Sequence, residues 1–256
     1  MTEHALTLAG GVAMPVVGLG TWQSRDNQCY QAVLDALELG YRHIDTATMY
    51  RNEDQVGRAI RDSGVPREQI FVTTKLPAER ADQARQTLEQ SLRLLGLDYL
   101  DLWLIHWPPH GSAAPQTWAE LLKARGDGLA RAVGVSNYSA PQIDELMTAT
   151  GEAPAVNQIP WSPWEYSAWL LKAHAERGVV VEGYSPFKRS RLSDPVLAAI
   201  AAEHGVTPAQ VILRWHVEHD VVVIPKSVRR ERLASNLDIF GFELSPDEVA
   251  RIDGLG

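Results

Sequence analysis

Cysteine is almost absent from this chain: Cys29 is the only one among 256 residues. A single thiol excludes an internal disulfide and indicates a reducing compartment, and we interpret Cys29 as a helix packing residue. Residues 1–11 contain the acidic Glu3 and only a short apolar stretch, unlike a signal peptide. No run approaches the ~18 apolar residues that span a membrane. We therefore expect a cytoplasmic protein without a membrane partner.

The chain also lacks an excess of positive charge. It has 24 Lys and Arg against 32 Asp and Glu, a net charge of −8. This balance argues against a general nucleic-acid surface, which needs a basic face. The hydrophobic content of 45% allows a large core, and the length is near that of one (β/α)8 barrel. We expect a single domain over residues 1–256, and a monomer.

Eight short apolar runs alternate with amphipathic segments and predict eight strands. Runs such as 179–181 and 221–224 are continuous, which is typical of strands covered on both faces. Two earlier runs, Ala5–Leu8 and Ala13–Val16, predict a β-hairpin. The eight runs are Val16–Gly20, Tyr41–Asp45, Ile70–Lys75, Tyr99–His106, Ala130–Ser136, Ala155–Gln158, Val179–Tyr184 and Val221–Pro225.

The segments between these runs have helical patterns. Asp26–Leu39 has an apolar face, with Asp26 as a possible N-cap and Gly40 as a stop. Thr207 and Pro208 are suited to the start of another helix. Strands that alternate with helices form either a closed parallel barrel or an open doubly wound sheet.

The glycine motif of a dinucleotide-binding open sheet is missing. That fold needs G-x-G-x-x-G directly after its first strand. Here Gly18-Leu19-Gly20 is followed by Thr21-Trp22-Gln23, without the third glycine. The sequence therefore predicts an α/β fold, a (β/α)8 TIM barrel, with the N-terminal hairpin capping the barrel bottom.

Several predicted strands end in a chemically useful side chain. Asp45, Lys75 and His106 each close a strand, and Tyr50 follows Asp45 in a loop. Strand ends share one rim of such a barrel, so we expect the four to meet. Reduction of a carbonyl needs a proton donor, and a nearby ammonium lowers the high pKa of tyrosine. Lys75 would do this for Tyr50, Asp45 would hold Lys75 charged, and His106 would orient the carbonyl oxygen.

Each residue alone has a plainer interpretation. Asp45 resembles a helix cap, Tyr50 a rim aromatic, Lys75 a surface charge and His106 a core histidine. A metal site at His106 and His110 is not expected, because two prolines between them break the helix that would align both rings.

Seven short motifs also follow one another in a recognisable order. They are Gly18–Trp22, Tyr41–Ala47 with Tyr50, Thr73–Lys75, Ile105–Pro108, Gly134–Asn137, Val156–Gln158 and Ile224–Ser227. Together they resemble the aldo-keto reductase family, and 225–232 is most similar to the bacterial 2,5-diketo-D-gluconate reductase-like members. The resemblance implies that Tyr50 is the proton donor, with Asp45, Lys75 and His106 in support.

The resemblance further implies a nicotinamide cofactor across the barrel mouth. It places Ser136, Asn137 and Gln158 at the carboxamide, and Tyr184 against the nicotinamide ring. The other cofactor-binding residues that it implies are Ser185, Lys226, Ser227, Val228, Arg232 and Asn236.

We expect the cofactor to be NADPH/NADP+. Arginine suits the phosphate on the adenosine ribose, and 226–232 is basic in an acidic chain. A solvated helix start is the plainer interpretation of that run. Ser235 stands where many relatives carry a glutamate that contacts the ribose, so this chain departs from the family pattern there.

Two departures from the family pattern concern the substrate pocket. Residues 159–164 carry tryptophans where relatives have an acid and a histidine. We expect Trp161 to line an aromatic pocket with Trp22 and Trp107; packing under the rim is the alternative. The chain stops at Gly256, where relatives commonly continue into a loop over the substrate. We therefore expect an open site with broad selection of small-molecule carbonyls.

These observations predict an enzyme, an NADP-dependent oxidoreductase acting on CH–OH groups, that reduces ketones and aldehydes to alcohols. The alternative is an NADP(H)-binding redox sensor or regulatory subunit with little turnover. An isomerase or lyase on the same fold would need a carboxylate base or a Schiff-base lysine, without the tyrosine.

Overall fold

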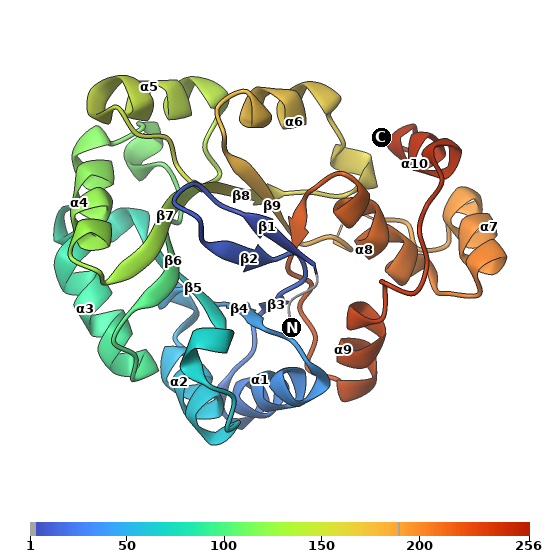
Figure 1. Cartoon of the computed structure of the whole chain (residues 1–256), viewed down its shortest axis with the longest axis horizontal. Helices are drawn as coiled ribbons and strands as arrows, with labels where there is room; N and C mark the ends of the chain where they lie inside the picture. The colour runs from blue at the N-terminus through green and yellow to red at the C-terminus, as the bar shows by residue number, and fades with distance from the viewer. Residues whose placement is uncertain (1–3, 189) are drawn as a thin grey trace.

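Eight parallel strands form a closed barrel in the computed structural model, which describes residues 4–188 and 190–256 (Figure 1). Glu3 lies outside the described residues. Each strand pairs with the next in chain order, and a parallel bridge between Val17 and Val223 joins the last to the first. The predicted barrel is therefore confirmed. Its strands are β3 (Leu19–Gly20), β4 (His43–Asp45), β5 (Phe71–Leu76), β6 (Leu100–Ile105), β7 (Ala130–Ser136), β8 (Val156–Pro160), β9 (Val180–Tyr184) and β10 (Val222–Val223).

Strands β3 and β10 are shorter than the runs that predicted them. They are joined by the Val17–Val223 bridge and single backbone bonds, such as the one from Gly18 N–H to the Val223 oxygen at 2.9 Å. A ladder this short leaves most of the two predicted runs outside regular strand.

Helices surround the barrel and begin and end near the predicted signals (Figure 1). Gly40 ends the first helix in the left-handed region, with φ 108°. The N-cap prediction was wrong: Arg25 has the extended backbone of an N-cap and Asp26 is the first helical residue. Thr207 caps its helix as predicted. The helices are α1 (Asp26–Leu39), α2 (Glu53–Asp62), α3 (Ala84–Leu95), α4 (Pro115–Gly126), α5 (Ala140–Thr150), α6 (Ala168–Ala175), α7 (Pro195–His204), α8 (Pro208–Glu218), α9 (Arg230–Leu237) and α10 (Pro246–Asp253).

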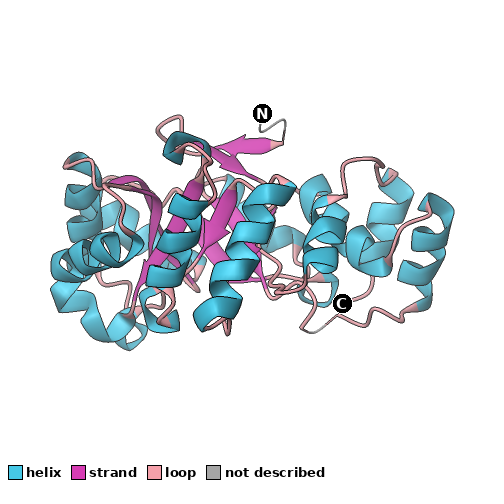
Figure 2. Cartoon of the chain, turned by 90° about the horizontal axis from the view of Figure 1, so that it is seen from below, coloured by secondary structure: helices cyan, strands magenta, loops and turns pink. Residues whose placement is uncertain are grey.

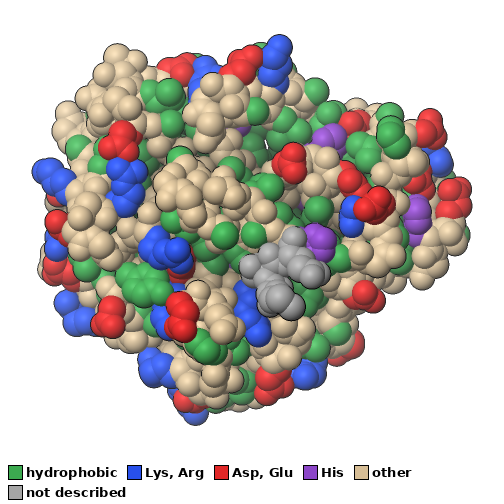
Figure 3. Space-filling view, viewed as in Figure 1, with side chains coloured by type: hydrophobic (Ala, Val, Ile, Leu, Met, Phe, Trp, Pro, Cys, Tyr) green, Lys and Arg blue, Asp and Glu red, His purple; other side chains and the backbone are tan. Residues whose placement is uncertain are grey.

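An N-terminal hairpin closes one end of the barrel, as predicted. Strands β1 (Ala5–Thr7) and β2 (Ala13–Pro15) lie across the strand starts (Figure 2). Met14 of β2 is fully buried against the interior side chains Leu102 and Val156. On this hairpin face, acidic and basic side chains are interspersed (Figure 3).

A second apolar core lies outside the barrel, where α7, α8 and α10 extend to one side (Figure 1). Its centre is a stacked pair of buried rings, Trp161 and Trp215, with centroids 6.2 Å apart. Among the described residues, no single helix has the length and apolar character to cross a membrane; the bent pair α7–α8 meets both criteria only as a pair.

The barrel interior changes from apolar to polar along its axis. Near the hairpin it contains Leu102, Leu104, Val156 and other aliphatic side chains. Towards the strand ends it contains fully or nearly fully buried polar side chains, which we call the polar core. Side chains two apart on a strand face the same way, so each strand contributes to successive layers. The polar core comprises His43 and Asp45 of β4, Thr73 and Lys75 of β5, Gln158 of β8 and Glu182 of β9.

Candidate active site

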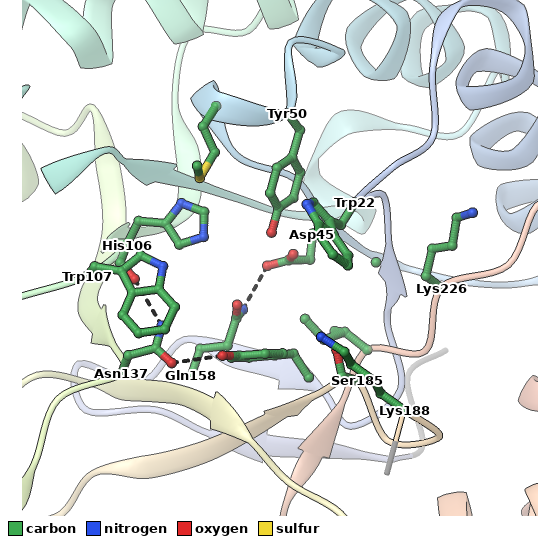
Figure 4. A pocket seen from close by; sticks show the side chains of 14 residues that line it. Trp22, Asp45, Tyr50, His106, Trp107, Asn137, Gln158, Ser185, Lys188 and Lys226 are labelled. Atoms are coloured by element: carbon green, nitrogen blue, oxygen red, sulfur yellow. Dashed lines mark hydrogen bonds between the residues drawn. The ribbon is translucent and has the colours of Figure 1, made fainter. Parts of the chain in front are cut away.

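The four candidate catalytic residues lie together at the barrel mouth, with Lys75 beneath the Tyr50 ring; Figure 4 shows the other three, Asp45, Tyr50 and His106. Asp45 ends β4, and His106 follows β6. Tyr50 ends the short 3-10 helix η1 (Thr48–Tyr50), which is anchored because the Thr48 hydroxyl donates to the backbone oxygen of Lys75 at 2.9 Å. The Tyr50 ring lies with its centroid 5.2 Å from Lys75 Nζ and 5.7 Å from the His106 ring centroid.

Lys75 and Asp45 form a buried ion pair. Lys75 Nζ donates to the two carboxylate oxygens of Asp45 at 2.6 and 2.8 Å, and to the Thr46 backbone oxygen at 2.8 Å. Burial is the largest single influence and would lower the pKa of Lys75, but the charge and hydrogen bonds of Asp45, together with the Tyr50 and Glu182 groups, outweigh it and the pKa is raised. Lys75 is therefore charged at neutral pH. Because desolvating two ions is unfavourable, such a pair indicates a chemical role more than a stabilising one.

The prediction that the pKa of Tyr50 is lowered was wrong. Burial raises the pKa of Tyr50, and the nearby Lys75 charge only partly opposes this. The prediction considered the ammonium but not the desolvation of the phenolate. Tyr50 is therefore a protonated phenol at neutral pH, which is the form that can donate a proton.

His106 is a neutral ring at the same mouth. Burial, and secondarily the Lys75 charge, lower the pKa of His106 to about 3. Its Nδ1 is buried and has no hydrogen-bond partner among the described residues. An unpaired buried N–H is more unfavourable than an unpaired lone pair, so we assign the single ring proton to Nε2.

A pocket of about 340 Å³ opens between these residues (Figure 4). Lys226 borders it on the side away from His106 and Trp107 (Figure 4). Of the predicted site residues, the lining includes Asp45, Tyr50, His106, Asn137, Gln158, Tyr184, Ser185, Lys226, Trp22 and Trp107. The sequence reading missed Gly20, Met49, Lys188 and Ile224, which also line the pocket. Gly20 and Ile224 lie within motifs named from the sequence, and Met49 and Lys188 lie within a few residues of a predicted site residue.

The amide candidates belong to one hydrogen-bond network. The Asn137 amide donates to the His106 backbone oxygen at 3.1 Å and the Ser136 hydroxyl at 2.9 Å, and its oxygen accepts from the Tyr184 hydroxyl at 2.9 Å. Ser136 is 1% exposed and does not line the pocket, because its hydroxyl donates to the Gln158 backbone oxygen. Ser136 is therefore a buried hydrogen-bond partner of Asn137 and not a lining residue.

Gln158 links the ion pair to a second carboxyl group. Its Nε2 donates to Asp45 Oδ2 and to Glu182 Oε2, both at 2.8 Å. Two acceptors on one side require the amino group there, so the amide oxygen is the atom directed to the pocket.

The basic segment lies at the start of α9, beside the pocket. Lys226 is exposed, and the buried Ser227 hydroxyl accepts from Arg229 N–H at 3.2 Å. Arg232 and Asn236 are one turn apart on α9 and share a face. Ser227, Val228, Arg232 and Asn236 do not themselves line the pocket.

The arginines of this segment differ in their partners. Arg230 forms ion pairs with Asp35 at 3.0 Å and Glu38 at 2.8 Å, both on α1. Across the described residues, neither Arg229 nor Arg232 forms an ion pair within 4.0 Å. Arg232 is therefore available to an external anion, whereas Arg230 ties α9 to α1.

One pocket prediction was wrong. Trp161 is 1% exposed and packs in the second apolar core, so it does not line the pocket. Side chains alternate along β8 and its continuation. Because Gln158 faces the interior, Ile159 and Trp161 face outwards. Trp22 and Trp107 do line the pocket and are about half exposed, with Lys188 Nζ 5.9 Å from the Trp22 ring centroid.

Comparison with known proteins gives a consistent picture. The family model described as "Aldo/keto reductase family" matches residues 16–256. Morphine 6-dehydrogenase from Pseudomonas putida is 44% identical over 98% of this chain and 90% of its own length. Glycerol 2-dehydrogenase (NADP(+)) from Saccharomyces cerevisiae is 42% identical, with the same coverage of both chains. The crystal structure of an aldo-keto reductase from Bombyx mori in complex with NADP has a TM-score of 0.92 and 38% identity, covering 97% of this chain and 91% of its own.

Proposed function

Because this chain belongs to the aldo/keto reductase family, we propose that it reduces aldehydes and ketones to alcohols, with Tyr50 as the proton donor. As a member of that family it is an NADP-dependent oxidoreductase. The observation that carries the proposal is the buried Lys75–Asp45 pair beside a protonated Tyr50.

The residues at the mouth have complementary roles in this reaction. NADPH, when bound, supplies the hydride for the carbonyl carbon. His106 Nε2–H donates to the carbonyl oxygen and holds it near Tyr50. Tyr50 then gives its phenolic proton to that oxygen, and the Lys75 charge stabilises the phenolate that remains. Asp45 keeps Lys75 charged and in place through its two short hydrogen bonds.

The donor set fits a phosphorylated dinucleotide. At the mouth, the Gln158 amide oxygen is directed to the pocket, where it can accept from a carboxamide. At the other end, Arg232 and Lys226 can bind the 2′-phosphate, because neither forms an ion pair in the described part of the chain. The proposed cofactor-binding residues are Ser136, Asn137, Gln158, Tyr184 and Ser185 at the nicotinamide end, and Lys226, Ser227, Val228, Arg232 and Asn236 at the phosphate end.

We also propose a broad preference for apolar or aromatic carbonyls. Trp22 and Trp107 are 47% and 49% exposed and present ring surface to the pocket. Apolar walls with a few directed polar groups are typical of sites for such ligands. Besides Asp45, the charged side chains among the described lining residues are Lys188, whose Nζ lies 5.9 Å from the Trp22 ring centroid, and Lys226.

The first experiment is a rate measurement with the purified chain. Consumption of NADPH is followed with phenylglyoxal, methylglyoxal, a β-keto ester and 2,5-diketogluconate, with NADH as the comparison cofactor. We expect turnover with NADPH, fastest with the aromatic carbonyl. Binding of NADPH without turnover of any carbonyl would contradict the proposal and favour a redox sensor.

A further inference from the structure

Glu182 is a buried carboxyl group that the proposed reaction does not use. It lies on β9 directly beside Gln158 of β8 in the strand register, and its side chain is 0% exposed. Its Oε2 accepts from Gln158 Nε2 at 2.8 Å. Its Oε1 is 3.5 Å from His43 Nε2 and has no other polar partner among the described residues. A carboxylate in this position would be poorly compensated.

The protonation state of His43 decides what Oε1 faces. His43 Nδ1 lies 3.4 Å from the Pro15 backbone oxygen, which can only accept, so Nδ1 carries a proton. Burial is the main cause that lowers the pKa of His43 to about 3, so the ring is neutral. Nε2 therefore carries no proton and presents its lone pair as an acceptor. The Thr73 hydroxyl, 3.3 Å from the same nitrogen, is the competing donor for that single lone pair.

Glu182 Oε1 therefore meets an acceptor, not a donor. An ionised Glu182 would place its own lone pairs against that of His43 Nε2, which is repulsive. A protonated Glu182 would instead donate from Oε1 to Nε2 and still accept from Gln158 at Oε2. With His43 neutral, only the protonated acid avoids this repulsion and still accepts from Gln158.

The surrounding charges lead to the same conclusion. The titratable groups that face Glu182 are His43 and Asp45 of β4, Lys75 of β5 and Tyr50 of η1. Its paired neighbours on β8 and β10 are Gln158 and Val222, which do not titrate. Lys75 is already neutralised by Asp45, so a second carboxylate would be in excess. Burial, and then the Asp45 charge, raise the pKa of Glu182 to about 8.

We propose that Glu182 is a positioning residue, which in its protonated form bridges His43 to Gln158 and holds the Gln158 amide oxygen towards the pocket. Gln158 donates one N–H to Asp45 and the other to Glu182, so its amide group cannot flip to exchange the positions of its oxygen and nitrogen. The inference rests on the proposed function, because it assigns to that amide oxygen the carboxamide of the nicotinamide.

Ionisation of Glu182 would then weaken the reaction. A negative charge at Glu182 raises the pKa of Tyr50, so the phenol becomes a poorer acid, and it removes the bond to His43. We expect the kcat/KM for reduction to fall as the pH rises through about 8.

Two variants separate the charge of Glu182 from its shape. Glu182→Gln mimics the neutral acid, since its oxygen accepts from Gln158 and its amino group donates to His43. Glu182→Leu removes both bonds. Glu243→Gln is the matched control, because Glu243 is an exposed acid whose side chain is 87% accessible.

The first readout is infrared difference spectroscopy, which does not depend on activity. The spectrum of wild type minus Glu182→Gln should contain a protonated carboxyl band at about pH 6 that is lost by about pH 9. Other buried acids such as Glu53 cancel in the difference. A carboxylate signal at about pH 6 would overturn the proposal.

The second readout is NADPH affinity from cofactor fluorescence, together with the pH profile. Glu182→Leu should weaken binding about tenfold or more, and Glu182→Gln should stay within about threefold of wild type. Glu182→Gln should also lose the fall in kcat/KM near pH 8. Wild-type affinity in a folded Glu182→Leu, or an unchanged pH profile in Glu182→Gln, would overturn the proposal. If Glu182→Leu does not fold, the Glu182→Gln profile and the infrared spectrum decide. Failure of wild type to bind NADPH would instead contradict the proposed function, and the infrared test would still stand.

Discussion

The two ends of the proposed cofactor path are constructed in opposite ways. At the barrel mouth, Asp45, Lys75 and Gln158 are buried and hydrogen-bonded to one another. At α9, Lys226 and Arg232 are exposed, and no ion pair restrains them in the described part of the chain. A buried network fixes geometry and protonation in a low dielectric, whereas exposed cations contribute binding that salt screens. Substitutions at the first end should therefore change chemistry or folding, and those at the second only affinity.

Replacing Tyr50 with phenylalanine should have the largest effect on rate. The variant keeps the ring beside His106 and loses only the proton donor. We expect kcat to fall roughly 10²–10⁴-fold, with the Kd for NADPH nearly unchanged. Single-turnover kinetics and fluorescence titration measure the two quantities. Tyr30→Phe is the control, because its hydroxyl bonds Asp62 on the outer surface; wild-type rates in Tyr50→Phe would refute the role of Tyr50.

Lys75→Met should damage both rate and stability. Removing the ammonium leaves Asp45 buried without its partner, which costs about 3–5 kcal/mol in comparable cases. Burial raises the pKa of an unpaired Asp45, so the folded variant binds a proton that the unfolded chain loses as pH rises. The loss of stability should therefore be smaller in acid than at neutral pH. Denaturant unfolding at both pH values measures it, with exposed Lys123→Met as control; equal losses at both pH values would contradict this account.

Strand parity explains which parts of the mouth the sequence could predict. Residues that end parallel strands of one barrel must share a rim, so Asp45, Lys75 and His106 could be grouped without a structure. The same alternation of side chains along a strand also determines which other residues face the barrel interior. Gln158 faces inwards, which turns Trp161 outwards to the second core. Tyr184 borders the pocket, which places Glu182 in the interior two residues earlier.

Other features depend on distances that no spacing reveals. The pKa of Tyr50 depends on how far its ring is enclosed, and burial outweighs the Lys75 charge that the sequence suggested. The basic run 226–232 predicted one cluster, but the fold divides it. Arg230 is bound by Asp35 and Glu38, which lie nearly two hundred positions earlier in the chain.

The buried end should also make stability depend on pH. The pKa of Glu182 is raised to about 8, so the folded chain keeps a proton that the unfolded chain releases near its usual value. Stability from this group is complete below the unfolded pKa and is lost as pH rises through about 8. The free energy of unfolding that Glu182 contributes at low pH, relative to high pH, amounts to a few kcal/mol at most. Unfolding of wild type and Glu182→Gln across this range tests it; parallel curves would exclude an effect of Glu182.

Arg232→Ala should have the smallest effect of these substitutions and should change only the affinity for NADPH. Loss of one charge-assisted bond to the 2′-phosphate should weaken NADPH binding by about 1–3 kcal/mol and leave NADH almost unchanged. The pair Arg230 and Arg232 provides the control within one helix. Arg230→Ala breaks two surface ion pairs with α1 and should lower stability slightly, with little change in the preference for NADPH.

Salt distinguishes the two ends most directly. Because Arg232 is exposed, rising ionic strength should weaken NADPH binding to wild type and reduce its advantage over Arg232→Ala. The turnover rate at saturating NADPH should stay nearly constant, since Lys75 and Asp45 are buried away from ions. Fluorescence titrations and saturating rates over a range of salt measure both. If Arg230→Ala lost the NADPH preference and Arg232→Ala kept it, the 2′-phosphate would lie against α1, and the assignment of this end to Arg232 would be wrong.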